Sequence, residues 1–128
     1  MTAPRYQGFF PGQAVIEGYG AGGFRFAGMS HRGSILVLPS GISAWPVDEV
    51  KALDVDSLQP LFDEPKGSVE FLLIGTGRSI VPVPAAVRER LKRHGIRFDP
   101  MATGHAVSTY NILLEERRKV AAALIAAP

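Results

Sequence analysis

The sequence contains no cysteine. A chain without thiols has no disulfide framework, no cysteine-ligated zinc site and no cysteine nucleophile, and it suits a reducing compartment. Long apolar runs are missing too, because none approaches the roughly 18 residues of a membrane-spanning helix. Residues 1–12 hold one arginine and no apolar segment, so neither a secretory signal nor a transit peptide is expected. These absences predict a cytoplasmic protein without direct membrane insertion.

The chain also lacks a large excess of charge of either sign, since the formal net charge is only +2. Proteins that bind nucleic acid neutralise many phosphates, so we expect no nucleic-acid partner. The charges are nevertheless unevenly distributed: residues 48–70 carry seven acids, and residues 85–119 carry eight of the 14 basic residues. This asymmetry indicates either an ordinary solvated surface or a docking face for an acidic protein. The candidate partner-binding residues are Arg88, Lys92 and Arg93.

The first half of the chain has the pattern of short β-strands. Alternating or continuous apolar residues separated by glycine turns are typical of an antiparallel meander, which we expect over residues 14–47. Residues 1–12 contain two prolines and two glycines and are expected to be an irregular lead-in. The predicted strands are Ala14–Tyr19, Phe24–Phe26 with a continuation over Met29–Arg32, Ser34–Pro39 and Ile42–Trp45.

The second half alternates strands and helices. Ser57 is expected to cap a helix of about one turn. Val69–Ile74 reads as a central strand buried on both faces. A basic helix begins at Pro84 and ends with Gly95 as a left-handed cap, and Phe98 marks a short strand. Thr103 is expected to cap the next helix, which breaks near Arg118. The apolar residues 120–125 suit either a buried helix or a strand.

Two polar stretches are candidate ligand sites. Gly75-Thr76-Gly77 follows a strand, as phosphate-binding turns do, but it lacks the third glycine of a dinucleotide site and the lysine of a P-loop. A tightly packed structural turn is the alternative. The second stretch comprises Thr103, Thr109, Tyr110 and Asn111. Its alternative roles are a helix cap, a core ring with a bonded hydroxyl and an amide that bonds sheet-end backbone.

No set of side chains has the spacing of a known catalytic or metal site. His31, His94 and His105 are scattered, so we expect no metal. Ser34, Ser40 and Ser108 lack the sequence context of a nucleophile elbow. We therefore expect a non-enzymatic protein without a cofactor. It would be either a protein-binding module or a domain that binds a small molecule or anion at Gly75-Thr76-Gly77.

Several stretches together resemble one family. They are Phe24-Arg25-Phe26-Ala27-Gly28, Gly33-Ser34-Ile35-Leu36-Val37-Leu38-Pro39, Trp45-Pro46, Leu72-Leu73-Ile74-Gly75-Thr76-Gly77, Met101-Ala102-Thr103, Thr109-Tyr110-Asn111 and Val120-Ala121-Ala122-Ala123-Leu124-Ile125. Over residues 14–126 the chain is similar to the family of mitochondrial respiratory complex I assembly factor 3 and its small bacterial and archaeal relatives, a domain of unknown function.

The resemblance implies a fold and a role. The fold would be α/β, a three-layer β/β/α single domain over residues 1–128. It would have a mixed central sheet, the N-terminal antiparallel meander and two main helices packed on the sheet. The resemblance also implies that residues 120–125 form a closing strand. The implied role is non-catalytic, that of an assembly factor with protein partners and a link to a membrane respiratory complex. Many relatives have aspartate where this chain has Ala102, and often cysteine and arginine at Val107 and Ser108, so acid–base chemistry is not implied here.

Overall fold

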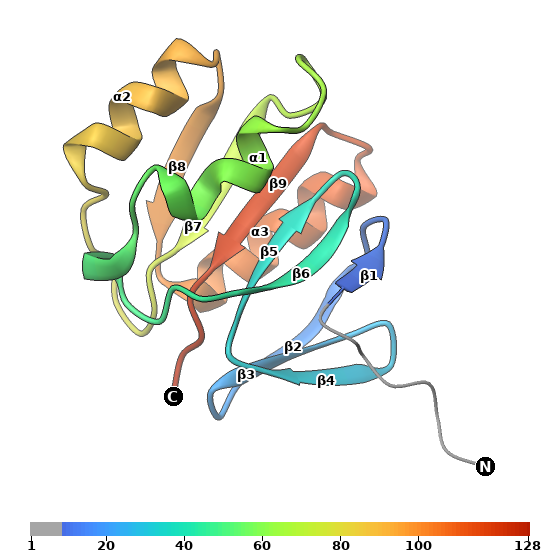
Figure 1. Cartoon of the computed structure of the whole chain (residues 1–128). Helices are drawn as coiled ribbons and strands as arrows, with labels where there is room; N and C mark the ends of the chain where they lie inside the picture. The colour runs from blue at the N-terminus through green and yellow to red at the C-terminus, as the bar shows by residue number, and fades with distance from the viewer. Residues whose placement is uncertain (1–8) are drawn as a thin grey trace.

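A six-stranded mixed sheet forms the centre of the protein in the computed structural model, which describes residues 9–128 (Figure 1). Its strands follow the order β1-β6-β5-β9-β7-β8. They are β1 (Phe9–Pro11), β6 (Gly41–Trp45), β5 (Ser34–Leu38), β9 (Val120–Leu124), β7 (Phe71–Gly75) and β8 (Arg97–Met101). A separate antiparallel sheet contains β2 (Ile16–Gly20), β3 (Gly23–Phe26) and β4 (Met29–Arg32).

Strand β9 joins the two halves of the large sheet. It pairs antiparallel with β5, where Ile35 lies opposite Leu124. It pairs parallel with β7, where Phe71 lies opposite Val120. All five residues of β5 and of β9 are buried, which explains why β9, and β5 after Ser34, are continuously apolar instead of alternating.

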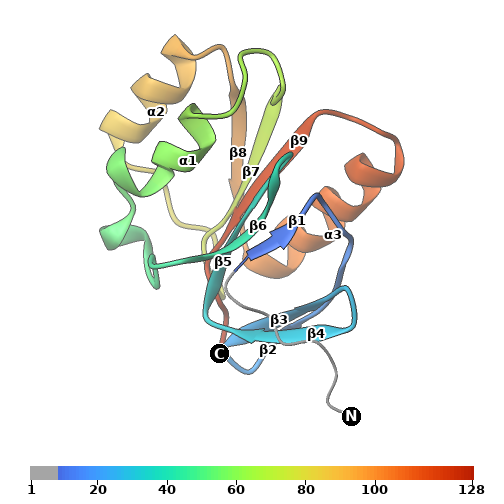
Figure 2. The same ribbon diagram turned by 45° about the vertical axis from the view of Figure 1, so that its right-hand side comes forward.

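The helices lie on both faces of this sheet (Figure 2). Helix α2 (Ala85–Arg93) connects β7 to β8, and α3 (Thr103–Glu115) connects β8 back to β9 on the other side of β7. Parallel crossovers are right-handed. Because these two cross the sheet in opposite directions, α2 and α3 fall on opposite faces. The short helix α1 (Gln59–Phe62) accompanies α2, and two short 3-10 helices precede it at Val50–Ala52 and Asp56–Leu58.

Each face of the sheet covers its own hydrophobic cluster. On the α2 side, Leu72 and Ile74 pack with residues of α1 and α2, including Leu61 and Leu91. On the α3 side, Leu73 packs with α3 and with the three-stranded sheet, including Ile16, Phe24, Phe26, Ala106 and Tyr110. The mixed α/β fold with a central mixed sheet and a separate antiparallel meander is therefore confirmed. The expected single meander over residues 14–47 is divided, because β5 and β6 belong to the large sheet.

Several predicted boundaries agree with the structure. Strand β7 is flanked by β8 and β9, and Leu72, Leu73 and Ile74 are fully buried. Gly95 has φ +69°, and the Ile96 N–H donates to the Leu91 carbonyl at 3.0 Å, so the left-handed cap of α2 is confirmed. The closing strand is also confirmed as β9.

Two predictions about strands and the lead-in were wrong. Residues 9–11 form β1, which pairs with β6 at one edge of the sheet, and residues 1–8 of the expected lead-in lie outside the described residues. Met29–Arg32 is not a continuation of β3. The chain reverses at Ala27 and Gly28, both at positive φ, and β4 returns antiparallel to β3.

Three predicted helix starts were also wrong. Thr103 is the first residue of α3, and the capping position belongs to Ala102, whose side chain makes no capping bond. Ser57 lies inside a 3-10 helix, where its hydroxyl donates to the Asp54 carbonyl. Pro84 immediately precedes α2 instead of starting it. No helix within residues 9–128 is long and apolar enough to cross a membrane.

Candidate functional site

The predicted glycine turn and the start of α3 meet at one end of the central sheet. Gly75 ends β7, and the Thr76 N–H donates to the Met101 carbonyl at 2.9 Å. The Thr103 N–H donates to the Gly77 carbonyl at 2.8 Å. The structure thus brings together four of the residues predicted from the sequence. We call this group, Gly75, Thr76, Gly77 and Thr103, the junction.

The Thr103 hydroxyl lies at the centre of the junction and is fully buried. Its Oγ1 donates to the Ile125 carbonyl at 2.7 Å and accepts from the Gly77 N–H at 2.9 Å. One side chain therefore ties the turn after β7 and the segment after β9 to the start of α3. This tertiary role explains why Thr103 does not cap its own helix.

The Thr76 hydroxyl is similarly engaged. It donates to the Ser79 carbonyl at 2.6 Å and accepts from the Val81 N–H at 3.1 Å. Thr76 is only 6% exposed. Buried polar groups must be paired with protein or water, and here the partners are backbone groups of the following loop. The hydroxyl thereby fixes the path of the chain from β7 towards α2.

The structure explains why both positions of the turn are occupied by glycine. A Cβ at Gly75 would lie 2.9 Å from Thr103 Oγ1 and 3.1 Å from Leu124 Cδ2, so only glycine allows β7 and α3 to approach this closely. Gly77 has φ +101°, which L side chains rarely adopt. Gly75 thus packs against the start of α3 and Gly77 has a left-handed backbone, which agrees with the alternative of a tightly packed structural turn.

Tyr110 and Asn111 attach α3 to the three-stranded sheet. Tyr110 is fully buried, its hydroxyl donates to the Ala14 carbonyl at 2.9 Å, and burial raises the pKa of its phenol well above the usual value. The Asn111 amide accepts from the Ile16 N–H at 2.8 Å and donates to the Ile16 carbonyl at 2.9 Å. The core-ring and backbone-bonding alternatives for these two residues are thus confirmed.

The remaining member of the predicted ligand set lies elsewhere. Thr109 lines a separate cavity of about 350 Å³ together with Glu70 and Lys119. The open side of the junction is a shallow hollow lined by Gly77 and Arg78, among others. The predicted ligand residues are therefore distributed over several places, and the hydroxyls of Thr76 and Thr103 face backbone. Their binding to a ligand stays a prediction.

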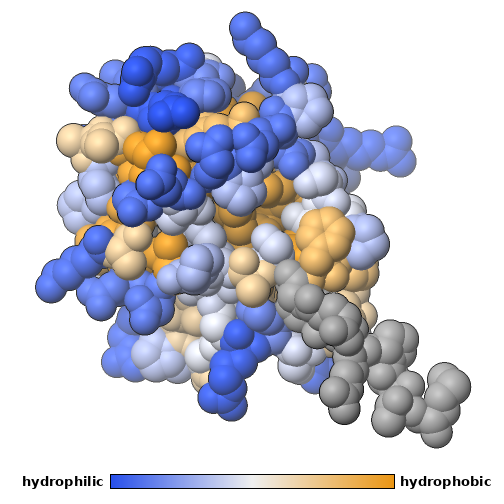
Figure 3. Space-filling model, in the orientation of Figure 1, coloured by the Kyte–Doolittle hydropathy of each residue, from blue (hydrophilic) through white to orange (hydrophobic). Residues whose placement is uncertain are grey.

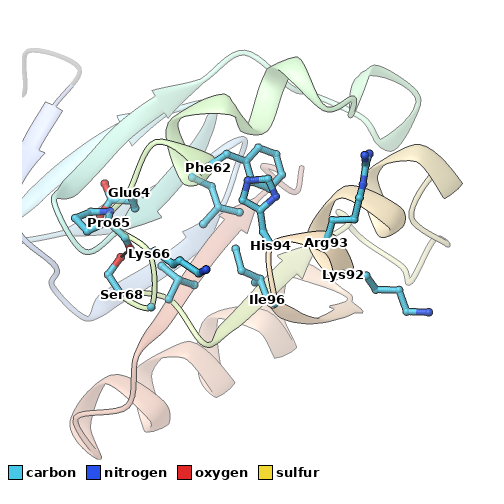
Figure 4. A pocket seen from close by; sticks show the side chains of 13 residues that line it. Phe62, Glu64, Pro65, Lys66, Ser68, Lys92, Arg93, His94 and Ile96 are labelled. Carbon is cyan, nitrogen blue, oxygen red and sulfur yellow. Dashed lines mark hydrogen bonds between the residues drawn. The ribbon is translucent and has the colours of Figure 1, made fainter.

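A groove on the α2 side has a different character. It occupies about 530 Å³ between the loop of residues 64–69 and the C-terminal end of α2 with residues 92–96 (Figure 4). Its lining includes the buried apolar residues Leu61, Val69 and Ile96, which belong to the core cluster of this side. The groove is thus open on top and apolar at its base.

Two tight turns shape the walls of the groove. In the loop, the Ser68 N–H and hydroxyl both donate to the Pro65 carbonyl, at 3.0 and 2.6 Å, while Gly67 has φ +83°. On the opposite wall, the Gly95 cap turns the chain out of α2 and directs Ile96 back onto the core. Each wall is therefore a defined turn held by its own hydrogen bonds.

An aromatic pair borders the groove. The Phe62 and His94 rings lie with their centroids 4.5 Å apart at an interplanar angle of 39°. The Arg90 guanidinium lies 5.1 Å from the centre of the Phe62 ring, within the range of a cation–π contact. These contacts connect α1 to the end of α2 and present ring surface to the groove (Figure 4).

Cationic side chains surround this base. Lys66 extends from the loop across the groove, while Lys92 and Arg93 project outward at the far end (Figure 4). The one carboxylate in the lining, Glu64, accepts a hydrogen bond from the Ser40 hydroxyl at 2.6 Å. Hydrophilic side chains also gather over α2, with apolar surface between α2 and α1 (Figure 3). Two predicted partner-binding residues, Lys92 and Arg93, thus lie at the groove, and Arg88 lies exposed one turn earlier on α2.

Metal ligands are not grouped in the part of the chain that the structure describes. Among residues 9–128, no three histidine or acidic side chains are placed so that they could hold a metal ion together. The groove and its rim offer buried apolar surface, an aromatic pair and exposed cations.

The sequence profile of one family matches residues 16–125 of this chain. That family is described as a protein of unknown function, DUF498/DUF598. The chain belongs to this family. The matched segment begins in β2 and ends just after β9, so it contains the junction, the groove and both long helices.

Two kinds of relatives are similar to this chain. An uncharacterized protein of Rhodobacter capsulatus is 38% identical over 98% of this chain and 94% of its own length. The protein named NADH dehydrogenase [ubiquinone] 1 alpha subcomplex assembly factor 3 of Danio rerio is 38% identical over 89% of this chain and 65% of its own length. The human protein of the same name is 29% identical, and this chain covers 61% of it. The chain thus spans somewhat less than two thirds of the assembly factors that it matches.

Solved structures share the fold. A protein of Bartonella henselae, described as an outer membrane protein, is 44% identical with a TM-score of 0.89 over 93% of this chain and 99% of that chain. The Rpa2829 protein of Rhodopseudomonas palustris is also 44% identical, with a TM-score of 0.81 over 100% of this chain and 93% of that chain. A more distant Bordetella pertussis structure, described as an Mth938-like domain, has a TM-score of 0.75. The DUF498/DUF598 chain therefore has the Mth938-like fold.

The sequence interpretation missed most of the groove. Phe62 and Lys66 come from one stretch of the chain and His94 from another, and none of them belongs to a recognisable motif. Of the two walls, only the helix end at Gly95 was predicted. Only the folded chain brings residues 64–69 and 92–96 together as the walls of one groove, where Phe62 at the end of α1 contacts His94 at the end of α2.

Proposed function

We propose that this chain is a non-catalytic, assembly-factor-like protein that binds another protein and contributes to the assembly of a membrane respiratory complex. The observation that carries the proposal is the similarity, over 89% of this chain, to a relative named as a complex I assembly factor. The proposed role needs neither a catalytic group nor a cofactor. The cytoplasmic location expected from the sequence stays a prediction.

The geometry supports a protein-binding role over a ligand-binding one. The hydroxyls of Thr76 and Thr103 are already bonded to backbone, so they have little capacity left for a ligand. In contrast, Arg88, Lys92 and Arg93 are exposed and form no ion pair among residues 9–128. A basic surface of this kind attracts acidic partners and accelerates their association. We propose that this exposed face of α2 meets the partner protein.

The proposal is tested by recovering partners of the tagged full-length chain from its own host. We expect subunits or assembly factors of a membrane respiratory complex to be enriched, as identified by mass spectrometry. A triple charge reversal, Arg88→Glu with Lys92→Glu and Arg93→Glu, should remove this enrichment. A matched triple, Arg25→Glu with Arg32→Glu and Arg118→Glu, changes the net charge equally at other exposed positions and should retain it.

A second measurement addresses the biological role. Deleting the gene should lower the amount of assembled respiratory complex on a native gel, and the wild-type chain should restore it. An unchanged amount of every respiratory complex, together with no enriched subunit or assembly factor, would overturn the proposed function.

A further inference from the structure

The groove combines an apolar base with a basic rim. Buried Leu61, Val69 and Ile96 lie at its base, and the contacting, mutually tilted rings of Phe62 and His94 form part of its border. The only carboxylate in the lining belongs to Glu64, against the ammonium groups of Lys66 and Lys92 and the guanidinium of Arg93. The groove is therefore complementary to a ligand that carries one apolar group for the base and negative charges that face the rim.

Its size limits what can enter. About 530 Å³ is within the range of roughly 300–1,000 Å³ typical of small binding pockets. A volume of this kind accepts one or two side chains of a peptide but not a folded domain. Recessed apolar surface with an aromatic border is also where anchor residues of protein partners bind, because burial of a large side chain dominates such contacts.

We propose that this groove binds a short acidic segment of the partner protein, with one aromatic or large aliphatic side chain inserted as an anchor. The inference rests on the protein-binding function proposed above and assigns it a site. The anchor packs on Phe62, His94 and Ile96. On one side of the anchor, carboxylates of the segment form ion pairs with Lys66. On the other side, carboxylates form ion pairs with Lys92 and Arg93, whose long side chains extend from the rim.

An anionic membrane surface is a poorer fit to the same groove. Lipid phosphates would pair with Lys66, Lys92 and Arg93, since ion pairing alone does not distinguish a phosphate from a carboxylate. They would not occupy the recessed base at Leu61 and Val69, which requires a side chain that projects inward. The apolar base therefore favours a peptide, and vesicles become a control in the test.

The test uses the full-length chain and fluorescent synthetic peptides. The probe is a short peptide of aspartate and glutamate residues around a central tryptophan. One control peptide replaces the tryptophan by alanine, and another replaces the acids by lysine. Binding is followed by fluorescence anisotropy, and the site is located by NMR from the backbone amide shifts of residues 64–69 and 92–96. Vesicles of phosphatidylglycerol, with phosphatidylcholine vesicles as reference, measure lipid binding.

We expect the acidic tryptophan peptide to bind, to shift the groove amides and to bind more weakly as salt is added. Both control peptides should lose at least about tenfold in affinity. The double variant Lys66→Glu with Arg93→Glu should lose about as much, and His94→Ala should lose part of it. The matched double variant Arg25→Glu with Arg118→Glu, which has the same net charge, should bind as the wild type does.

Three results would overturn the inference. They are absence of peptide binding, binding that the groove variants leave unchanged, and amide shifts that map to another surface. Binding of phosphatidylglycerol vesicles through Lys66 and Arg93 without peptide binding would assign the groove to a membrane surface instead. Variant spectra that keep the wild-type dispersion show that a loss of binding is not a loss of folding.

The outcome is separable from that of the proposed function. If host partners are recovered equally by the wild type and by Lys66→Glu with Arg93→Glu, the groove inference fails and the assembly role stands. If the peptide binds as described but the host yields no respiratory subunit or assembly factor, the groove stands and the assembly role fails.

Discussion

The two sides of the central sheet use their polar groups in opposite ways. On the α3 side, the side chains of Thr103, Tyr110 and Asn111 bond the backbone of distant segments, and they connect α3 to β2, β7 and the segment after β9. On the α2 side, Lys66 and Lys92 stand at the rim of an open groove and form no ion pair among the described residues.

This difference shows why a polar pattern in sequence is an ambiguous sign of function. A glycine turn followed by threonines is typical of ligand-binding loops, yet buried backbone groups at the end of a sheet also need hydrogen-bond partners. The junction uses its hydroxyls for that need. The candidate functional surface lies instead where charged groups remain exposed beside apolar surface.

The sharpest test of this comparison is whether the two sides are equally well packed. Leu72 faces the α2 side and Leu73 faces the α3 side, and both are fully buried. Truncation to alanine at either position should lower the free energy of unfolding by about 2–5 kcal/mol, through lost burial and the cavity left behind. Chemical denaturation of both variants measures this. A loss below about 1 kcal/mol for Leu72→Ala alone would mean that the groove side relaxes to fill the space.

The next largest effect is expected at the junction glycine. Gly75→Ala places a methyl group 2.9 Å from Thr103 Oγ1 and 3.1 Å from Leu124 Cδ2, so we expect a loss of about 1–3 kcal/mol from overpacking. Gly77→Ala has open space and should lose only about 1–2 kcal/mol through its left-handed backbone. Thermal unfolding compares the two. Equal stability of Gly75→Ala and the wild type would contradict the close approach of β7 and α3.

Removing the Thr103 hydroxyl tests whether the junction is structural. Thr103→Val keeps the shape of the side chain but leaves the Gly77 N–H and the Ile125 carbonyl without this partner. The expected loss is about 1–3 kcal/mol, the cost of an unpaired buried polar group. Partner recovery should be unchanged at a temperature where the variant is folded. If the variant had wild-type stability but bound no partner, the junction would be a binding site and not a structural element.

Tyr110 gives the α3 side a dependence on alkaline pH. Because burial raises the pKa of the folded phenol above the usual value of about 10, the unfolded state loses this proton first. The contribution of the protonated Tyr110 phenol to the free energy of unfolding is complete below about pH 10, and it decreases as the pH rises above 10. Tyr110→Phe should therefore flatten the alkaline decline in the free energy of unfolding. At neutral pH it should lower that free energy by about 0.5–1.5 kcal/mol, because the hydrogen bond to Ala14 is lost. Identical alkaline slopes for both proteins would show that Tyr110 does not cause the decline.

The smallest effect is expected at the groove. Lys66→Glu with Arg93→Glu should change the free energy of unfolding by no more than about 0.5 kcal/mol, because exposed charges without partners contribute little. Urea titration with the matched Arg25→Glu and Arg118→Glu double variant as reference checks this. A large loss would place these cations in the structural framework and remove the contrast between the two sides.

Much of the fold could be predicted because its elements carry strong local patterns. A few neighbouring residues are enough to predict the apolar strands β5 and β7, the glycine cap at Gly95 and the turn near Arg118. Residues 120–125 are different, because their alanines favour a helix and only insertion between β5 and β7 makes them a strand. Local propensity does not contain that information, and the family resemblance supplied it.

The site was less predictable for the same reason. Thr103 has the residue type of a helix cap, and only the position of Gly77 and Ile125 beside it gives its hydroxyl another task. The roles expected for Tyr110 and Asn111 were found because a buried ring and a backbone-bonding amide are the common uses of these residues. The groove depends on the meeting of Phe62 and His94, which are distant in sequence and form no motif.

The position of β9 also bears on how this chain reaches its fold. It follows every other strand in sequence, yet it occupies the interior of the large sheet and pairs with residues as distant as Ile35. Until it is in place, β5 and β7 each present an unpaired edge, and such edges associate readily with other chains. Long-range pairing of this kind slows folding. During synthesis, the nascent chain therefore carries two open β-edges until residues 120–124 have left the ribosome, which is the interval in which it is most exposed to aggregation.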